Sequence, residues 1–217
     1  MINSEELENS LGRRIFNEFL SEHFAHSMPT LSQKFDKLTE MYFNFNSVVN
    51  ISALRTLDDV YIKHYLDSVY PYKHFDGSCC DVGCGGGFPC IPLALVTPHE
   101  FLGIDGVAKK LTLIMNASFE LCMKNISTQH VRAEELAKTR KFDTVSARAV
   151  ADIDTALSYC APLADKNGKI ILYRTQNDER ATTKTENKYK IELSEIIDYT
   201  LPFTEINRRL FIYRKTA

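Results

Sequence analysis

The stretch Cys79-Cys80-Asp81-Val82-Gly83-Cys84-Gly85-Gly86-Gly87-Phe88-Pro89-Cys90-Ile91-Pro92-Leu93 decides the fold of this chain. It begins as a short apolar strand, passes through four glycines within five residues, and continues as a helix. Because glycine lacks a Cβ atom and readily adopts positive φ, a ligand can lie against bare backbone there. The two prolines suit the first turn of the following helix, where no N–H is required. The combination predicts a ligand site at the carboxyl edge of a parallel sheet.

Two classes of adenosine cofactor compete for a glycine turn of this kind. Dinucleotides require Gly-x-Gly-x-x-Gly, but the third glycine position counted from Gly83 holds Phe88. The spacing present is Asp-x-Gly-x-Gly-x-Gly, from Asp81 to Gly87, which resembles that of S-adenosylmethionine-dependent methyltransferases. Ordinary turns and bulges also collect glycine, so this stretch alone leaves a purely structural interpretation open.

A second acidic residue ends the next predicted strand. Phe101 to Asp105 reads as a strand that finishes in a carboxylate, twenty-two positions after Gly83. A carboxylate there can accept hydrogen bonds from both ribose hydroxyls. Asp105 therefore predicts an adenosine ligand without choosing between NAD and S-adenosylmethionine. Capping of the following helix is compatible with that role.

The composition is that of an ordinary globular protein, with 44% hydrophobic and 25% charged residues among 217. No apolar run is long enough to cross a bilayer, and the polar, acidic start from Met1 to Glu6 does not resemble a signal peptide. The net charge is only −2, so an RNA substrate would need a local basic face. A cytoplasmic protein with no membrane partner is expected.

The cysteine and histidine pattern predicts no metal site. None of the six cysteines forms Cys-x-x-Cys, and His23 with His26 has no plausible further ligands nearby. Free thiols in a buried strand fit a reducing compartment better than a disulfide scaffold.

The first 75 residues are predicted to form a helical extension, packed on a core domain of residues 76–217. Hydrophobic residues recur there at helical spacing in two segments, and Thr56, followed by Asp58 and Asp59, marks the start of a third helix. The expected helices run from Asn3, in a capping box with Glu6, to about Ala25, from about Pro29 to Phe45, and from Thr56 to about Tyr70. Asn46 to Ala53 is expected to be a loop.

From Ser78 onward, strands and helices alternate in the sequence, which predicts a parallel sheet covered on both faces. Strands are expected near 78–82, 100–105, 126–131, 142–147, 168–174, 194–200 and 208–214. Helices are expected near 89–97, 107–124, 134–139, 151–163 and 178–189. The last two strands lack a helix between them and could pair antiparallel at the edge. The predicted class is α/β: a doubly wound, mostly parallel, seven-stranded Rossmann-like sheet with a helical extension.

Several further motifs are linked along the chain. They are Asn50-Ile51-Ser52-Ala53, His64-Tyr65-Leu66-Asp67-Ser68, Asp105 with Lys109-Lys110, Arg132-Ala133-Glu134 and Ser146-Ala147-Arg148-Ala149. Together with the glycine stretch, they resemble the bacterial 16S rRNA guanine-N7 methyltransferases, also called the glucose-inhibited division protein B family. The resemblance extends from Asn50 to Lys215. The chain departs from the family pattern at Cys90, at Gly106 and at Arg174-Thr175, where the family usually has Gly, Ser and Lys-Gly.

The resemblance implies methyl transfer from S-adenosylmethionine to N7 of a guanine in 16S rRNA or the small ribosomal subunit, by a protein expected to be a monomer. The family pattern places cofactor contacts at Gly83, Phe88, Ala133, Glu134 and Arg148. The glycine spacing and the strand end add Gly85 and Asp105. The candidate substrate contacts are His64, Asp67, Arg174 and Arg209.

Arg148 is the residue expected to orient the substrate or the cofactor. Guanine N7 has a free lone pair and no proton to lose, so transfer to it requires orientation and no general base. An ion pair to Asp143 or Asp152 is the structural alternative for Arg148. For His64 and Asp67, a hydrogen bond that joins the extension to the core is the favoured alternative.

Two other functions stay open on the sequence. A non-catalytic RNA-binding or assembly module would keep the fold without methyl transfer. An NAD-linked dehydrogenase would need the dinucleotide motif that is absent here. The choice of guanine N7 rests on the resemblance alone.

Overall fold

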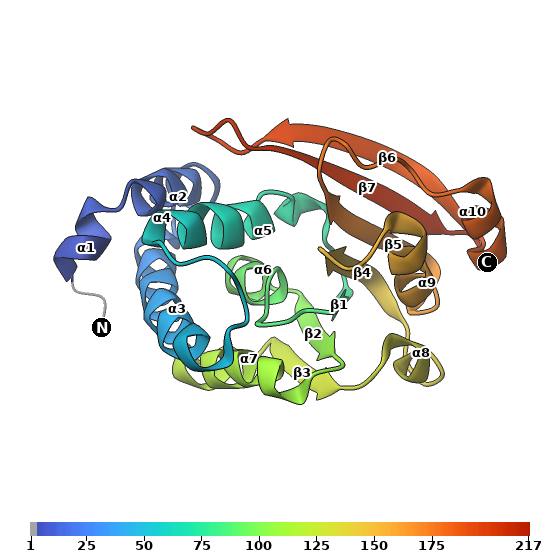
Figure 1. Ribbon diagram of the computed structural model, residues 1–217, viewed down its shortest axis with the longest axis horizontal. Coiled ribbons are helices and arrows are strands. Elements are labelled where there is room, and N and C mark those ends of the chain that lie inside the picture. Colours follow the sequence, from blue (N-terminus) through green and yellow to red (C-terminus); the bar gives the residue numbers. More distant parts are fainter. Residues whose placement is uncertain (1–3) are drawn as a thin grey trace.

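A twisted seven-stranded sheet forms the centre of the molecule in the computed structural model, which describes residues 4–217 (Figure 1). The strands are β1 (Ser78–Val82), β2 (Glu100–Asp105), β3 (Ile126–His130), β4 (Phe142–Arg148), β5 (Ala164–Arg174), β6 (Ile191–Thr200) and β7 (Asn207–Lys215). Their order is β3-β2-β1-β4-β5-β7-β6. The first five pair in parallel, and β7 pairs antiparallel with both β5 and β6. The predicted α/β class and the antiparallel edge pair are confirmed.

Helices cover both faces of this sheet. They are α6 (Cys90–Val96), α7 (Ala108–Glu120), α8 (Ala133–Leu136), α9 (Ile153–Cys160) and α10 (Thr183–Tyr189). Successive buried residues of a strand belong to opposite faces. Ile171 and Tyr173 of β5 pack in the hydrophobic cluster that contains the extension, α6 and α7, whereas Ile170 and Leu172 pack in the one with α8 and α9. The second half of β5 therefore carries consecutive buried apolar residues, Ile170 to Tyr173, as expected for a central strand covered on both faces.

The extension before β1 is helical. Its elements are α1 (Ser4–Asn9), α2 (Leu11–His23), α3 (Met28–Val49), α4 (Leu57–Asp59), the π-helix η1 (Val60–Leu66), α5 (Asp67–Val69) and the 3₁₀-helix η2 (Tyr72–His74). Fully buried aromatic rings hold α2, α3 and η1 together, with Phe16 and Phe35 4.7 Å apart and Phe35 and Tyr65 5.0 Å apart between ring centroids. These residues share one hydrophobic cluster with the sheet, so the extension packs directly on it.

Two predicted boundaries in the extension are wrong for local reasons. The single first helix is interrupted at Ser10, whose hydroxyl accepts a hydrogen bond from Arg13 N–H (3.1 Å) and so starts α2 anew. The predicted loop at Asn46 begins later, because α3 continues to Val49 and ends at Asn50 in the left-handed conformation. The predicted cap Asn3 lies outside the described residues.

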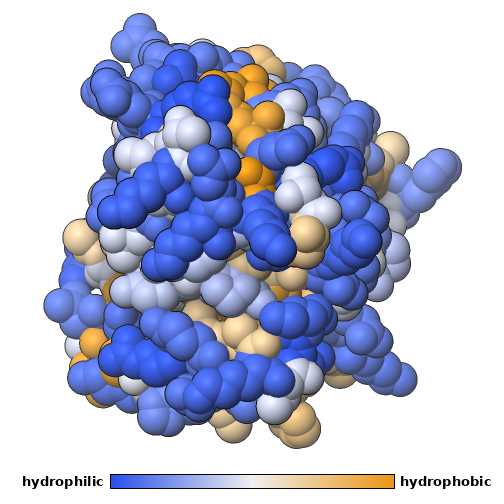
Figure 2. Space-filling view, turned by 90° about the vertical axis from the view of Figure 1, so that its right-hand side faces the viewer, coloured by the Kyte–Doolittle hydropathy of each residue, from blue (hydrophilic) through white to orange (hydrophobic). Residues whose placement is uncertain are grey.

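Two strands in the C-terminal half of the sheet are longer than predicted. β5 begins at Ala164 and β6 at Ile191, several residues before the expected starts. Both additions lie next to strand partners found only in the tertiary structure, Phe142 for Ala164 and Lys215 for Ile191. The side of the molecule that carries α8, α9 and α10 is mostly hydrophilic, with a short hydrophobic strip in its upper part (Figure 2).

Candidate active site

A cavity of about 570 Å³ opens where β1, β2 and β3 end. Its wall consists of Val82, Gly83, Ile104, Asp105, Gly106, Val107, Val131, Arg132, Ala133, Glu134, Glu135, Val150 and Tyr159. Valine and isoleucine side chains make up much of this wall, and its charged members are Asp105, Arg132, Glu134 and Glu135. A pocket that combines an apolar wall with a few charged groups, at the carboxyl ends of parallel strands, is typical of a small-molecule site.

The glycine turn forms one end of the cavity and must be free of side chains. Gly83 and Gly85 have φ of +67° and +54°. A Cβ atom added at Gly83 would lie 2.7 Å from Cγ2 of Val150, which is also part of the wall. At Gly86, a Cβ atom would overlap the side chain of Ile51, because the loop after α3 packs on the turn. Glycine is therefore required at position 83 both for the turn and for the shape of the cavity.

Asp105 is fixed at the end of β2 by two backbone hydrogen bonds. Its Oδ2 accepts from Gly85 N–H (3.0 Å) and its Oδ1 from Val107 N–H (2.8 Å). A carboxylate has about four lone-pair sites, so each oxygen keeps the capacity to accept one more hydrogen bond. Asp105 thus links the glycine turn to the start of α7 and still presents an acceptor pair to a ligand.

Ala133 and Glu134 form the wall beside the end of β3. Ala133 is buried, whereas the Glu134 side chain is exposed at the mouth. Arg132 was not predicted as a site residue, although it directly precedes this pair. Its guanidinium lies over Gly106, where an added Cβ atom would come within 2.9 Å of Arg132 Cζ. Glycine at position 106 therefore leaves room for the arginine side chain along the wall.

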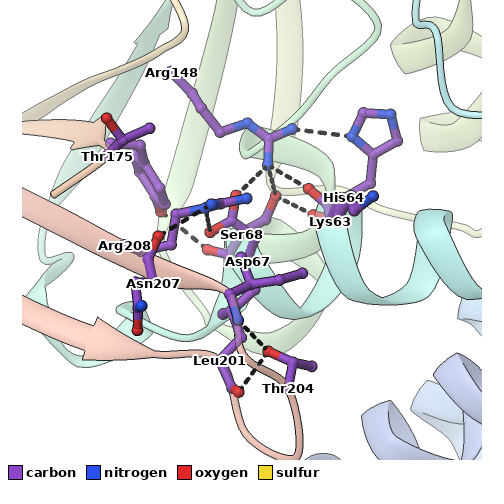
Figure 3. Close-up of polar contacts among 12 residues, drawn as sticks. Lys63, His64, Asp67, Ser68, Arg148, Thr175, Leu201, Thr204, Asn207 and Arg208 are labelled. Carbon is purple, nitrogen blue, oxygen red and sulfur yellow. Dashed lines mark hydrogen bonds and ion pairs between the residues drawn. The ribbon is translucent and has the colours of Figure 1, made fainter. Parts of the chain in front are cut away.

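Arg148 lies outside the cavity wall, in a buried cluster with the helical extension (Figure 3). Its Nη1 donates to the Lys63 carbonyl (3.2 Å), to Ser68 Oγ (3.2 Å) and to Asp67 Oδ2 (3.4 Å). Its Nη2 donates to His64 Nδ1 (3.2 Å). One side chain at the end of β4 thus joins four residues of η1 and α5, at positions 63, 64, 67 and 68, which precede it by 80 to 85 residues.

The structural alternative for Arg148 was an ion pair to Asp143 or Asp152, and this choice of partner is wrong. Asp143 lies at the start of β4, at the opposite edge of the sheet, and accepts from Ser78 N–H (2.8 Å). Asp152 caps α9 by accepting from Thr155 N–H (2.9 Å). The pair forms with Asp67 instead, because the extension covers the end of β4 where Arg148 lies.

A second arginine reaches the same carboxylate. Arg208 Nε donates to Asp67 Oδ1 (3.1 Å), so Arg148 from β4 and Arg208 from β7 share one buried anion. The cluster therefore contains two positively charged arginines and one negatively charged carboxylate, that of Asp67. The hydrogen bond predicted to join the extension to the core at His64 and Asp67 is present.

His64 is neutral in this cluster. Burial, and then the charge of Arg148, lower its pKa to about 3. Because arginine only donates, Nδ1 accepts and the ring proton is on Nε2, which faces Ser52 Oγ at 3.1 Å. Phe88 stacks on the imidazole with ring centroids 4.2 Å apart and planes at 9°. Phe88 thus packs under the extension, and its contact with a cofactor stays a prediction.

We expect the free energy of unfolding to fall as pH is lowered from about 6.5 toward 3, in part through His64. The unfolded imidazole takes up a proton near its ordinary pKa of 6.5, whereas the folded one stays neutral until about 3, so acid favours unfolding. His64→Asn keeps an acceptor for Arg148 but cannot titrate. Urea unfolding at a series of pH values should show a shallower acid loss in this variant. Parallel pH profiles would contradict the assignment.

The other two arginines predicted to contact substrate are held by protein groups. Arg174 is 9% exposed and donates to the carbonyls of Val150 (3.1 Å) and Ala151 (2.6 Å). It therefore supports the loop that carries Val150 into the cavity wall. Arg209 donates to both oxygens of Asp198 (2.7 Å each). Contact of either arginine with a substrate stays a prediction.

Asp81, the first residue of the glycine motif, is fully buried behind the turn. Its Oδ1 accepts from Ser146 Oγ (2.9 Å), whereas Oδ2 has no hydrogen-bond partner among the described residues. Burial raises the pKa of Asp81 to about 7. The carboxyl group therefore has unused hydrogen-bonding capacity at the base of the glycine turn.

Residues 4–217 contain neither a candidate metal site nor a candidate membrane span. In that range, no group of three or more His, Cys, Asp or Glu side chains is placed to hold a metal ion. No helix there combines the length and the apolar surface needed to cross a bilayer. All six cysteines have free thiols.

The glycine turn after β1, the carboxylate at the end of β2 and the antiparallel β7 between β5 and β6 define a Rossmann-like fold of the S-adenosylmethionine-dependent methyltransferase class. Solved structures of this class are similar. Magnesium protoporphyrin IX methyltransferase from Synechocystis, with bound cofactor, has a TM-score of 0.56 at 17% identity, covering 99% of this chain and 100% of that one. Ribosomal protein L11 methylase from Lactobacillus delbrueckii has a TM-score of 0.52 at 12% identity, covering 70% and 77%. At these identities the likeness concerns the fold.

Sequence comparison identifies the family within that class. The family model described as rRNA small subunit methyltransferase G matches residues 31–212. Ribosomal RNA small subunit methyltransferase G of Lysinibacillus sphaericus is 33% identical, over 84% of this chain and 82% of the relative. The protein of that name from Lactobacillus acidophilus is 32% identical, over 91% and 90%. The chain belongs to the rRNA small subunit methyltransferase G family.

Proposed function

We propose that this protein transfers a methyl group from S-adenosylmethionine to N7 of a guanine in 16S ribosomal RNA. One observation carries the proposal. The cavity lined by Asp105 and the cluster around Arg148 lie at the same edge of the sheet. Membership in the family supports the substrate class. In this proposal the protein is a cytoplasmic monomer that acts on 16S rRNA or on the small ribosomal subunit. Residues 76–217 form the methyltransferase domain, and residues 1–75 form its helical extension.

The residues present in the cavity fit S-adenosylmethionine. Asp105 keeps one free acceptor position on each oxygen for the ribose hydroxyls. The backbone at Ala133 and the Glu134 carboxylate would contact the adenine, and Gly83 with Gly85 would admit the methionine part against bare backbone. When bound, the cofactor supplies a methyl group on a cationic sulfur.

The acceptor side needs orientation and no proton transfer. Guanine N7 carries a free lone pair, so no side chain has to act as a base. The neutral ring of His64 accepts a hydrogen bond from Arg148 at Nδ1, so that nitrogen is not free to act as a base, and none is needed. Arg148 would donate to guanine O6, the acceptor beside N7, and leave the N7 lone pair free. In this role Arg148 fixes the base, and Asp67 fixes Arg148.

Replacing Glu134 with Ala should lower affinity for S-adenosylmethionine by roughly five- to tenfold, about 1 kcal/mol for one hydrogen bond at an exposed position. Titration calorimetry measures this directly. Glu135→Ala is the matched control, because the neighbouring carboxylate also lies at the mouth but binds Lys138 Nζ (2.8 Å). Equal affinities for wild type and Glu134→Ala would refute the adenine contact.

The proposed function is tested by methyl transfer from labelled S-adenosylmethionine to small-subunit rRNA, or to subunits, from a strain that lacks this protein. The RNA is digested and its nucleosides are identified by mass. We expect labelled 7-methylguanosine. Intact cofactor binding with no label on either substrate would favour the non-catalytic RNA-binding alternative. A thermal shift with NAD and none with S-adenosylmethionine would favour the dehydrogenase.

A further inference from the structure

The turn between β6 and β7 contains an exposed aromatic residue in the left-handed backbone conformation, which is unfavourable for a bulky side chain. Phe203 is 64% exposed, and its φ is +58°. Bulky side chains rarely adopt left-handed backbone, because the Cβ atom crowds the carbonyl oxygen, so surrounding structure must hold such a residue there.

The rest of the turn is built to hold that conformation. Leu201 is 1% exposed and packs in the core, and Ile206 packs against the same cluster. Leu201 N–H donates to the Ile206 carbonyl (2.9 Å), and Thr204 N–H donates to the Leu201 carbonyl (3.1 Å). Ile206 N–H donates to Thr204 Oγ1 (3.0 Å). The turn is thus anchored at both ends, and Phe203 is its one large apolar side chain left in solvent.

The turn projects from the edge of the sheet that carries the active site. Because β7 runs antiparallel to β5, the start of β7 lies beside the end of β5, with Arg209 opposite Arg174. In Figure 3, Leu201 and Thr204 of the turn are drawn below Asn207 and Arg208, and Asp67, which Arg148 and Arg208 both contact, lies between the turn and Arg148.

The cations beside the turn suit a polyanion. Arg148 and Arg208 have side chains that are 14% and 24% exposed, and they share the single carboxylate of Asp67. Proteins bind single-stranded nucleic acid by combining aromatic side chains, on which bases stack, with cations that contact the phosphates. The turn also carries the exposed carboxylate of Glu205, so the contact is carried by the aromatic ring and the arginine donors and not by a net positive charge.

An exposed aromatic side chain by itself needs no function, and Phe119 provides the contrast. Phe119 is 82% exposed near the end of α7. That helix starts at the carboxyl edge after β2 and runs back along the sheet, so Phe119 lies toward the opposite edge, away from the arginines. Its backbone is helical and carries no strain.

We propose that Phe203 is a substrate-docking residue, on which an unpaired base of the RNA stacks while its guanine is held at Arg148. The inference rests on the proposed function and adds a second point of contact on the RNA, outside the methyl-transfer site. It predicts that Phe203 contributes to RNA binding and leaves cofactor binding and the chemical step unchanged.

The test compares Phe203→Ala, Phe203→Tyr and Phe203→Asn with wild type in methyl transfer to whichever rRNA or subunit the wild type labels. Phe203→Ala should raise KM for the RNA by roughly 5- to 100-fold, the range for loss of one stacked base, with kcat and S-adenosylmethionine affinity unchanged. Phe203→Tyr keeps a ring and should stay close to wild type. Phe203→Asn should also raise KM, while its Tm rises, because Asn tolerates left-handed backbone.

Phe119→Ala is the matched control and should leave KM unchanged. A purely structural role for Phe203 would change Tm without changing KM for the RNA. Equal KM values for wild type and Phe203→Ala would overturn the inference alone. A wild-type protein that labels no RNA would contradict the proposed function, and the inference with it.

Discussion

Replacement of Arg148 by Ala should lower kcat/KM for methyl transfer by roughly 30- to 150-fold, about 2–3 kcal/mol for one charge-assisted hydrogen bond to the substrate. The same change should lower the free energy of unfolding by about 3 kcal/mol. Asp67 would keep only Arg208 as a cation, and His64 and Ser68 would lose their shared donor. Stability and turnover must therefore be measured on the same preparation.

Two further variants separate catalysis from folding at this position. Arg148→Lys keeps a charge near Asp67 but cannot reproduce the fork that reaches His64 and Ser68 together, so its stability should be closer to wild type than its turnover. Arg14→Ala removes an exposed arginine on α2 and should change neither quantity. A folded Arg148→Ala protein with wild-type turnover would show that Arg148 only joins the extension to the sheet.

Replacement of Asp105 by Ala should raise the Kd for S-adenosylmethionine by roughly 100-fold, about 3 kcal/mol for two ribose hydrogen bonds to a charged acceptor. The loss has a second source, since Gly85 and Val107 would lose the acceptor that fixes the glycine turn against α7. A lower Tm is expected for the same reason. Titration calorimetry, at a temperature where the variant is folded, gives the Kd.

Asp143→Ala is the control for this effect. Asp143 also accepts a backbone N–H, from Ser78 (2.8 Å), but it lies at the opposite edge of the sheet from the cavity. Its removal should lower Tm slightly and leave the Kd unchanged. If Asp105→Ala bound S-adenosylmethionine as tightly as wild type does, the cavity at the end of β2 would not be the ribose site.

The local parts of the site could be predicted because short stretches of chain dictate them. The positive φ values at Gly83 and Gly85 follow from a residue type that tolerates them, and Asp105 follows from the end of an apolar strand. The alternation of strands and helices after Ser78 fixed a parallel sheet, so residues at the carboxyl ends of neighbouring strands had to meet. Gly83, Asp105, Ala133 and Glu134 do line one cavity.

The partners of long charged side chains could not be predicted in the same way. Arginine reaches several ångströms from its backbone, so neighbours in sequence are poor guides to its ion pair. Arg148 was matched with Asp143 and Asp152, which are close in sequence, and it binds Asp67, 81 positions away. Arg174 is a candidate substrate contact on the sequence, and the structure buries it against backbone carbonyls of the loop after β4.

The sequence by itself therefore determined the class of fold, the turn that admits a cofactor and the acidic residue beside it, because backbone conformation and hydrophobic periodicity are local properties. Only the tertiary structure decided that the extension covers the end of β4, where Asp67 pairs with Arg148 and Arg208, and that Phe88 packs on His64. It also decided that Phe203 is exposed in the turn that precedes β7. These contacts depend on how separate elements pack, and packing depends on the whole chain.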